Sequence, residues 1–187
     1  MRRETDMAEA RNKRVEVRPE RCVGCRSCEL ACAVAHSKTK ELLAAIHEDP
    51  PPKTRVQVEA AGEYCVPLAC RHCEEAPCVA VCPTHAMKRD EPLSPVAVHD
   101  ELCIGCRACA YVCPFGVISL GGTGHPILKC DLCGERQGAG LEPACVNACP
   151  TGALRFVAMD QMTAERRKAA AADLVAGLQA AGKAKGK

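Results

Sequence analysis

Cysteine is the residue type in this chain that could carry chemistry. There are 17 cysteines among 187 residues, a share of about nine per hundred that is typical of a cysteine-built scaffold. Sixteen of them fall into four groups, and Cys65 stands apart. Thiolate sulfur binds zinc or the iron of iron–sulfur clusters, so these groups are candidate metal ligands. The groups are Cys22, Cys25, Cys28 and Cys32; Cys70, Cys73, Cys78 and Cys82; Cys103, Cys106, Cys109 and Cys113; and Cys130, Cys133, Cys145 and Cys149.

The spacing of the cysteines within each group indicates which metal centre they bind. The third group reads C-x2-C-x2-C-x3-C followed by Pro114, which is the bacterial ferredoxin pattern for a 4Fe–4S cluster. Three cysteines of one loop hold one cluster, and the fourth reaches the neighbouring cluster. The second and fourth groups have the same pattern with longer spacers, and the first has Ala33 in place of proline. The spacing therefore predicts four 4Fe–4S clusters.

Zinc is the competing interpretation. The fourth group alone, with two separated cysteine pairs, could be a structural zinc site. Three cysteines within seven residues, as in the first and third groups, crowd a single tetrahedral ion. Cys65 lies in a β-like stretch over 64–68 and is expected to be a buried free thiol. A ligand role for Cys65 would require one of the four groups to be broken.

The basic residues and histidines beside the cysteines have two interpretations. Positive charges next to the cysteines can raise local reduction potentials, or they are ordinary surface charge; these residues are Lys129, Arg71, Arg107 and Arg26. His72, between two cysteines, is expected to donate a hydrogen bond rather than bind iron. No partners are expected for four further histidines, namely His36, His47, His99 and His125.

Composition excludes several classes of protein. The balance of 25 basic and 23 acidic residues argues against a strongly basic nucleic-acid binder. No apolar run approaches the length of a membrane span. The first residues lack the apolar stretch of a secretory or twin-arginine signal, so we expect a cytoplasmic protein. In a reducing cytosol, grouped cysteines indicate metal or redox chemistry rather than disulfides.

Short elements must position these cysteines. We expect strands over 15–17, 54–60, 64–68, 95–99 and 153–157, and a hairpin of 117–120 with 126–129. Helices are expected over 29–36, 38–47 and 164–181, the last capped by Thr163. One unit repeats at 78–87, 109–118 and 145–154. Aromatic residues are scarce, with no tryptophan, so the clusters themselves are expected to fill the interior and to be required for folding.

The sequence predicts three regions. Residues 1–14 are expected to form a flexible arm, and residues 15–157 a four-cluster domain whose inner half covers about 65–120. Residues 158–187 are expected to form a C-terminal helix and basic tail.

Five stretches of the chain resemble a known family: 22–37, 67–83, 101–118, 129–133 and 145–150. They are similar to four-cluster ferredoxin-type electron-transfer subunits, which serve DMSO reductase, formate dehydrogenase and formate hydrogenlyase. The resemblance is strongest to the iron–sulfur protein of anaerobic carbon monoxide dehydrogenase and also includes the small subunit of tungsten aldehyde oxidoreductase. It implies an α+β fold of tandem bacterial-ferredoxin-like halves with pseudo-twofold symmetry, plus the C-terminal helix. Cys65 and His85 depart from the family pattern.

In this family the ligands are exchanged between loops, as the x3 spacing also favours. Carried over, the four sets are Cys22, Cys25, Cys28 with Cys149; Cys130, Cys133, Cys145 with Cys32; Cys70, Cys73, Cys78 with Cys113; and Cys103, Cys106, Cys109 with Cys82.

The resemblance implies a non-catalytic subunit that relays electrons from a catalytic oxidoreductase subunit. The catalytic partner would be a tungsten or molybdenum aldehyde or formate enzyme, or carbon monoxide dehydrogenase. The acceptor would be a flavin subunit that reduces NAD, or another acceptor, and copies could stack into a filament. A free soluble polyferredoxin and a zinc-stapled interaction scaffold are the alternatives.

Overall fold

The computed structural model describes residues 12–121 and 127–184. Most of the expected arm, part of the glycine turn after residue 120, His125 and the end of the tail lie outside these ranges. The chain divides into two units. One is Val15–Phe156, which contains every cysteine; the other consists of the residues before and after it.

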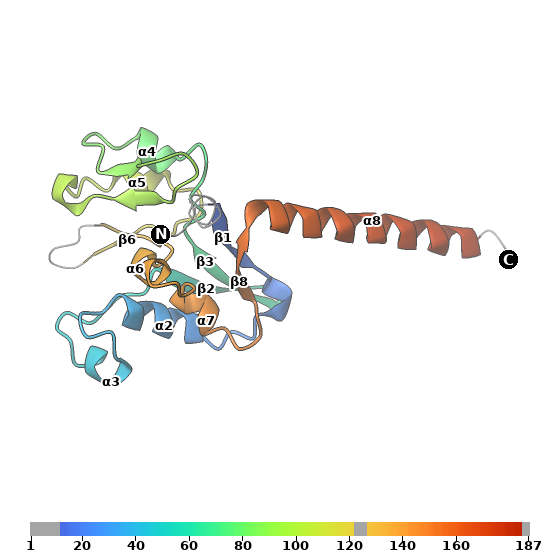
Figure 1. Cartoon of the computed structure of the whole chain (residues 1–187), viewed down its shortest axis with the longest axis horizontal. Helices are drawn as coiled ribbons and strands as arrows, with labels where there is room; N and C mark the ends of the chain where they lie inside the picture. Colours follow the sequence, from blue (N-terminus) through green and yellow to red (C-terminus); the bar gives the residue numbers. More distant parts are fainter. Residues whose placement is uncertain (1–11, 122–126, 185–187) are drawn as a thin grey trace. The chain divides into compact units, whose positions relative to one another are not determined.

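The strands of the described chain form two-stranded sheets (Figure 1). Three are antiparallel hairpins, and a fourth sheet pairs the first strand with the last. The pairs are β2 (Val56–Ala61) with β3 (Tyr64–Ala69), β4 (Met87–Arg89) with β5 (Val96–Val98), β6 (Ser119–Leu120) with β7 (Ile127–Leu128), and β1 (Lys13–Val17) with β8 (Leu154–Ala158). The predicted strands are confirmed, whereas the sequence analysis did not identify β4.

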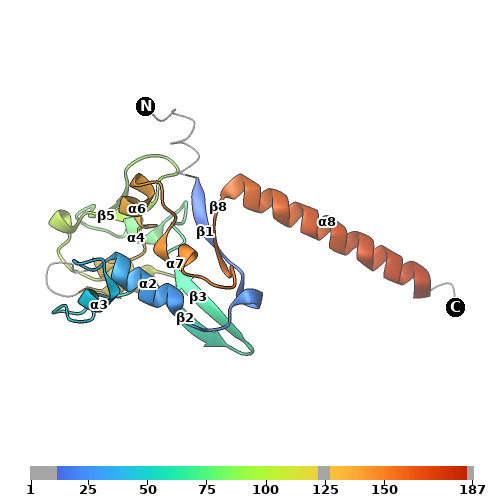
Figure 2. The same cartoon turned by 60° about the horizontal axis from the view of Figure 1, so that its bottom comes forward.

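The helices of Val15–Phe156 are short and mostly carry cysteines. They are α2 (Ser27–Ala35), α3 (Leu42–Ala45), α4 (Pro77–Ala80), α5 (Ala108–Val112), α6 (Gly134–Gly138) and α7 (Ala144–Asn147), with 3-10 turns η1 (Pro19–Arg21) and η2 (Asp100–Leu102). Helices α2 and α7 pack side by side (Figures 1 and 2). Cys32 lies inside α2, as the pattern over 29–36 predicts.

The helix expected over 38–47 is shorter than predicted. The amides of Lys38 and Thr39 donate to the Glu48 carboxylate at 3.1 and 2.8 Å, and Lys40 has a φ of 58°. These contacts hold the first residues as a loop, because amides bonded to a side chain leave the helical pattern. Only Leu42–Ala45 is helical.

The second unit contains the long helix α8 (Met159–Ala184). It begins four residues before the expected cap, so the prediction for Thr163 is wrong. Instead of capping, the Thr163 hydroxyl donates to the Asp160 carbonyl at 2.9 Å within the helix. Asp160 in the first turn suits the positive end of the helix dipole. Across the described residues, no helix combines the length and apolar character that a membrane crossing needs.

The core of Val15–Phe156 is partly built of cysteine. One buried cluster contains Cys28, Cys32 and Cys145 together with Val56, Val58 and Leu154. The other joins Cys109 to apolar residues of the hairpins and their neighbours, namely Met87, Val96, Ile118 and Ile127. Cysteines therefore occupy positions that large apolar side chains fill in ordinary cores.

Candidate metal centres

The first and third cysteine loops have the same backbone. Gly24 and Gly105 both have a φ of 68°, and Arg26 and Arg107 have φ values of 57° and 66°. Each arginine directly precedes a helix, α2 or α5. Two left-handed residues in a stretch of three turn the chain tightly. The repeated C-x-G-C-R-x-C sequence thus produces a repeated loop.

Gly24 also lies close to Cys65, the cysteine that belongs to none of the four groups. A Cβ atom at Gly24 would lie 2.9 Å from the Sγ atom of Cys65. Cys65 lies on β3, half-buried, and packs against the core cluster that contains Cys28 and Cys32. The Cys65 thiol therefore packs against the first cysteine loop, although the residue is half-buried rather than buried as predicted.

We predict that Gly24→Ala destabilises the protein by about 1–3 kcal/mol from backbone strain alone, and by more because of the contact with Cys65. Gly62→Ala is the matched control, since Gly62 has a φ of 61° but no neighbour within 4 Å of an added Cβ. Thermal unfolding of the metal-loaded protein measures both. Adding Cys65→Ala should restore part of the loss at Gly24 and none at Gly62; equal losses without rescue would contradict the contact.

The second and fourth loops share another arrangement. His72 and Leu132 have φ values of 50° and 58°. Their amides donate to the Sγ atoms of Cys70 and Cys130, both at 3.4 Å. Hydrogen bonds to sulfur favour the thiolate form. The hydrogen bond expected from the His72 side chain is thus supplied to Cys70 by the His72 backbone.

The Cys-Pro turns repeat as well. His85, Gly116 and Gly152 each stand three residues after a cysteine and have φ values of 54°, 60° and 65°. His85 departs from the family pattern in residue type but not in backbone conformation. Hydroxyls of Thr84 and Thr151 lie 3.8 Å from the Sγ atoms of Cys82 and Cys149.

Three cavities bring together candidate ligands from different parts of the chain. β8 pairs with β1, which brings the Cys-Pro turn at Cys149 beside the first loop. The cysteines that line the cavities are Cys22, Cys25, Cys28 and Cys149; Cys32, Cys130, Cys133 and Cys145, together with Cys70 of the second group; and Cys82, Cys103, Cys106 and Cys109.

Three candidate ligands, Cys73, Cys78 and Cys113, line none of these three cavities. Burial raises the pKa of the Cys78 thiol, and charge interactions with Cys70, Cys113 and Cys109 add to the rise. Cys73 belongs to the same loop and is half-buried. Its backbone carbonyl accepts a hydrogen bond from Arg89 at 2.6 Å.

The raised pKa values of several buried thiols in these sets indicate that bound metal ions are needed to stabilise their thiolate forms. Burial raises the pKa of Cys28 to about 11 and of Cys130 to about 12, and neighbouring thiols or carboxylates add to each rise. Burial likewise raises the pKa of Cys145, with further contributions from Cys130 and Cys32. Crowded buried thiols ionise reluctantly unless metal ions balance the charge. A soft, all-sulfur donor set fits iron–sulfur clusters.

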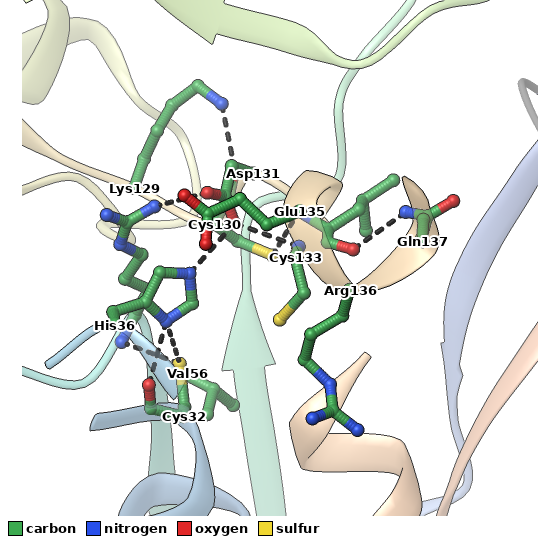
Figure 3. Close-up of polar contacts among 12 residues, drawn as sticks. Cys32, His36, Val56, Lys129, Cys130, Asp131, Cys133, Glu135, Arg136 and Gln137 are labelled. Carbon is green, nitrogen blue, oxygen red and sulfur yellow. Dashed lines mark hydrogen bonds and ion pairs between the residues drawn. The ribbon is translucent and has the colours of Figure 1, made fainter. Parts of the chain in front are cut away.

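His36 has partners that the sequence analysis missed. Its Nε2 atom lies 3.1 Å from the Asp131 carboxylate, and its Nδ1 atom lies 2.7 Å from the Cys32 carbonyl and 3.7 Å from Cys32 Sγ (Figure 3). Arg55 contributes an ion pair with Asp131 at 2.6 Å, and its amide donates to Cys32 Sγ at 3.2 Å. The expectation of no partners is therefore wrong for His36. It is also wrong for His99, whose ring nitrogens lie 3.3 Å from the Asp90 carboxylate and 3.4 Å from the Glu101 carboxylate.

This network sets the charge around Cys32. Burial alone would lower the pKa of His36, but the contacts with Asp131 and Cys32 raise it to about 9. Burial would raise the pKa of Cys32, yet the hydrogen bonds from His36 and Arg55 lower it. His36 and Asp131 are 95 residues apart, so spacing along the chain gives no sign of the pair. The Asp131–Cys133 spacing is the one local hint, since the Cys133 amide donates to Asp131 at 2.9 Å.

The four basic residues beside the cysteines differ in their surroundings. Arg107 is exposed, and Arg26 pairs with Glu29 at 3.4 Å on the surface. Arg71 lies over the Phe115 ring at 5.7 Å. Lys129 is only 3% exposed, so for this residue the surface-charge interpretation is wrong.

Comparisons with known proteins match the cysteine groups. A 4Fe-4S dicluster domain family matches residues 62–159, and a 4Fe-4S binding domain family matches residues 19–35. An iron–sulfur protein of Rhodospirillum rubrum is 39% identical over 168 residues, covering 83% of this chain and 87% of the relative. The electron transport protein HydN of Escherichia coli strain K12 is 37% identical over 166 residues, covering 79% and 91%. The thiosulfate reductase electron transfer subunit PhsB of Salmonella typhi is 39% identical over 158 residues, covering 79% and 76%.

Proposed function

The chain belongs to the family of ferredoxin-type 4Fe–4S electron-transfer subunits, and we propose that it holds four clusters and relays electrons out of a catalytic oxidoreductase subunit. The electron relay itself follows from membership of this family. The number of clusters, their ligands and the partners are the parts that we propose.

The ligand sets that we propose are those with exchanged fourth cysteines. The observation that supports them best is a cavity lined by Cys149 together with Cys22, Cys25 and Cys28. When bound, the clusters supply one-electron redox chemistry. The chain holds them through thiolates, directs backbone amides at the sulfurs and surrounds them with apolar side chains, which together tune the potentials.

The proposed architecture is a four-cluster domain over 15–157 made of two ferredoxin-like halves related by pseudo-twofold symmetry. The inner half covers about 65–120. Repeated loop conformations support this organisation, because the first and third loops share both of their left-handed residues, and the second and fourth share the one that follows the first cysteine by two residues. We further propose a cytoplasmic location, since clusters and free thiols persist in a reducing compartment.

Association with a catalytic subunit can be tested on the whole complex. We expect the tagged full chain, captured under anaerobic conditions, to bring down an oxidoreductase catalytic subunit. Adding the substrate of that enzyme (carbon monoxide, formate or an aldehyde) should bleach the visible absorption of the clusters. A chain that is captured alone, and that reduces several acceptors as a monomer, would instead support a free polyferredoxin.

We propose two further partners, a flavin subunit and other copies of this chain. A flavin subunit that reduces NAD would take up the electrons, and copies of the chain would associate into a filament. Leu174, Val175 and Leu178 on α8 are 72%, 52% and 74% exposed, which suits a helix that docks on another chain. Subunit analysis of the captured complex and electron microscopy examine these two partners directly.

A further inference from the structure

Lys129 is a buried cation held by backbone atoms. Its side chain is 3% exposed, and its Nζ atom donates to the carbonyls of Val96 and, at 2.9 Å, of Cys130. Within the part of the chain that the structure describes, no carboxylate pairs with this ammonium group. A buried ammonium ion without a counter-charge is strongly disfavoured. Its burial therefore points to negative charge that the side chains around it do not provide.

Thiols of two different cysteine sets lie within the electrostatic reach of Lys129. Lys129 directly precedes Cys130 and donates to its carbonyl at 2.9 Å, and Cys70 lines the same cavity as Cys130. Cys70 belongs to the second cysteine group and Cys130 to the fourth. Loading the two sets with iron–sulfur clusters would supply negative charge on both sides of the ammonium group.

A path of hydrogen bonds fixes Lys129 between the two loops. The Val96 amide donates to Nδ1 of His72 at 3.1 Å, and the His72 amide donates to Cys70 Sγ at 3.4 Å. The Val96 carbonyl accepts from Lys129, which also donates to Cys130. His72 and Val96 are 3% and 1% exposed. The cation thus has little freedom to move away and little water to screen it.

We propose that Lys129 raises the reduction potentials of two adjacent clusters together, the one held by Cys70, Cys73, Cys78 and Cys113 and the one held by Cys32, Cys130, Cys133 and Cys145. This inference rests on the proposed four-cluster function. Reduction adds one negative charge to a cluster, and a fixed buried cation stabilises that charge. Lys129 would thereby keep the reduction potentials of these two clusters similar, which favours electron transfer from one cluster to the other.

The test compares reduction potentials in variants of the full, cluster-loaded chain. Lys129→Gln keeps a hydrogen-bond donor but removes the charge, and Lys129→Arg keeps the charge. Lys40→Met is the matched control, because Lys40 is a lysine whose side chain is 52% exposed and paired with Glu135. Iron and sulfide are measured on each sample, and the potentials are followed by EPR during anaerobic redox titration.

We expect two of the four potentials to become more negative in Lys129→Gln, while the other two stay within error. Lys129→Arg should keep all four near their original values, and Lys40→Met should leave them unchanged. Lys129→Gln could instead lose iron. A loss of about half the iron, together with full iron content in Lys129→Arg, would also support a role of the Lys129 charge at two of the four clusters.

Three results would overturn the inference. The first is a fully loaded Lys129→Gln protein with four unchanged potentials. The second is equal damage in Lys129→Gln and Lys129→Arg, and the third is equal loss at all four clusters; either of these would indicate a packing role. A parent protein without iron and sulfide would refute the proposed function itself, so the two failures are distinguishable.

Discussion

Removing iron from the protein with a chelator is expected to unfold Val15–Phe156 as a whole. Cysteines make up half of the six buried members of one core cluster, and burial opposes ionisation of their thiols. Structural zinc contributes about 10–16 kcal/mol to the folding of zinc-finger peptides, and we expect the clusters to contribute on a similar scale, whereas a whole domain is stable by only about 5–15 kcal/mol. The apolar side chains that remain cannot make up a loss of that size.

Hydrogen exchange measures this unfolding region by region. Amides of the β2–β3 hairpin should lose their protection as iron leaves, and they report on the cysteine-containing unit. Peptides from α8 serve as the internal reference, since that helix belongs to the other unit. Before chelation, about sixteen irons per chain with a matching amount of sulfide are expected from four clusters. A colourless protein that retains native hairpin protection, or one that contains zinc without sulfide, would contradict the prediction.

Alanine substitutions in pairs of cysteines should reveal which of them share a cluster. Cys25→Ala and Cys149→Ala are each expected to remove about four irons, and the double variant no more than either single variant. The physical reason is that both side chains line one cavity, so the second substitution affects a cluster that is already lost. Cys25→Ala combined with Cys32→Ala, from two different sets, should remove about eight irons.

Iron and sulfide analysis of anaerobically prepared variants measures these losses, and EPR of the reduced samples identifies the clusters that remain. Cys65→Ala is the control from the same chain, and it should retain all the iron. A loss of about eight irons in the Cys25→Ala, Cys149→Ala double variant would mean that these residues belong to different clusters. That outcome would refute the exchange of fourth cysteines while leaving the iron–sulfur chemistry intact.

Local features of the chain were predictable because local physics produces them. The C-x-G-C-R-x-C loops need left-handed residues at fixed positions, and Gly24 and Gly105 supply them. Alternation in β2 puts Val56 and Val58 inside, as expected from a period of two. The expected helix over 38–47 was shorter than predicted because the Glu48 carboxylate, ten residues beyond Lys38, binds amides at its beginning. Local propensity contains no information on such a contact.

The sequence by itself determined the kind of ligand, the number of cysteine groups and the family, because donor type and short spacing are written along the chain. Only the tertiary structure decided that His36 meets Asp131, that Cys65 packs against Gly24, and that Lys129 is buried. These contacts arise where short hairpins and helices pack together, so the partners are distant in sequence. Spacing specifies how a loop can wrap a metal centre, whereas long-range packing specifies which charges surround it.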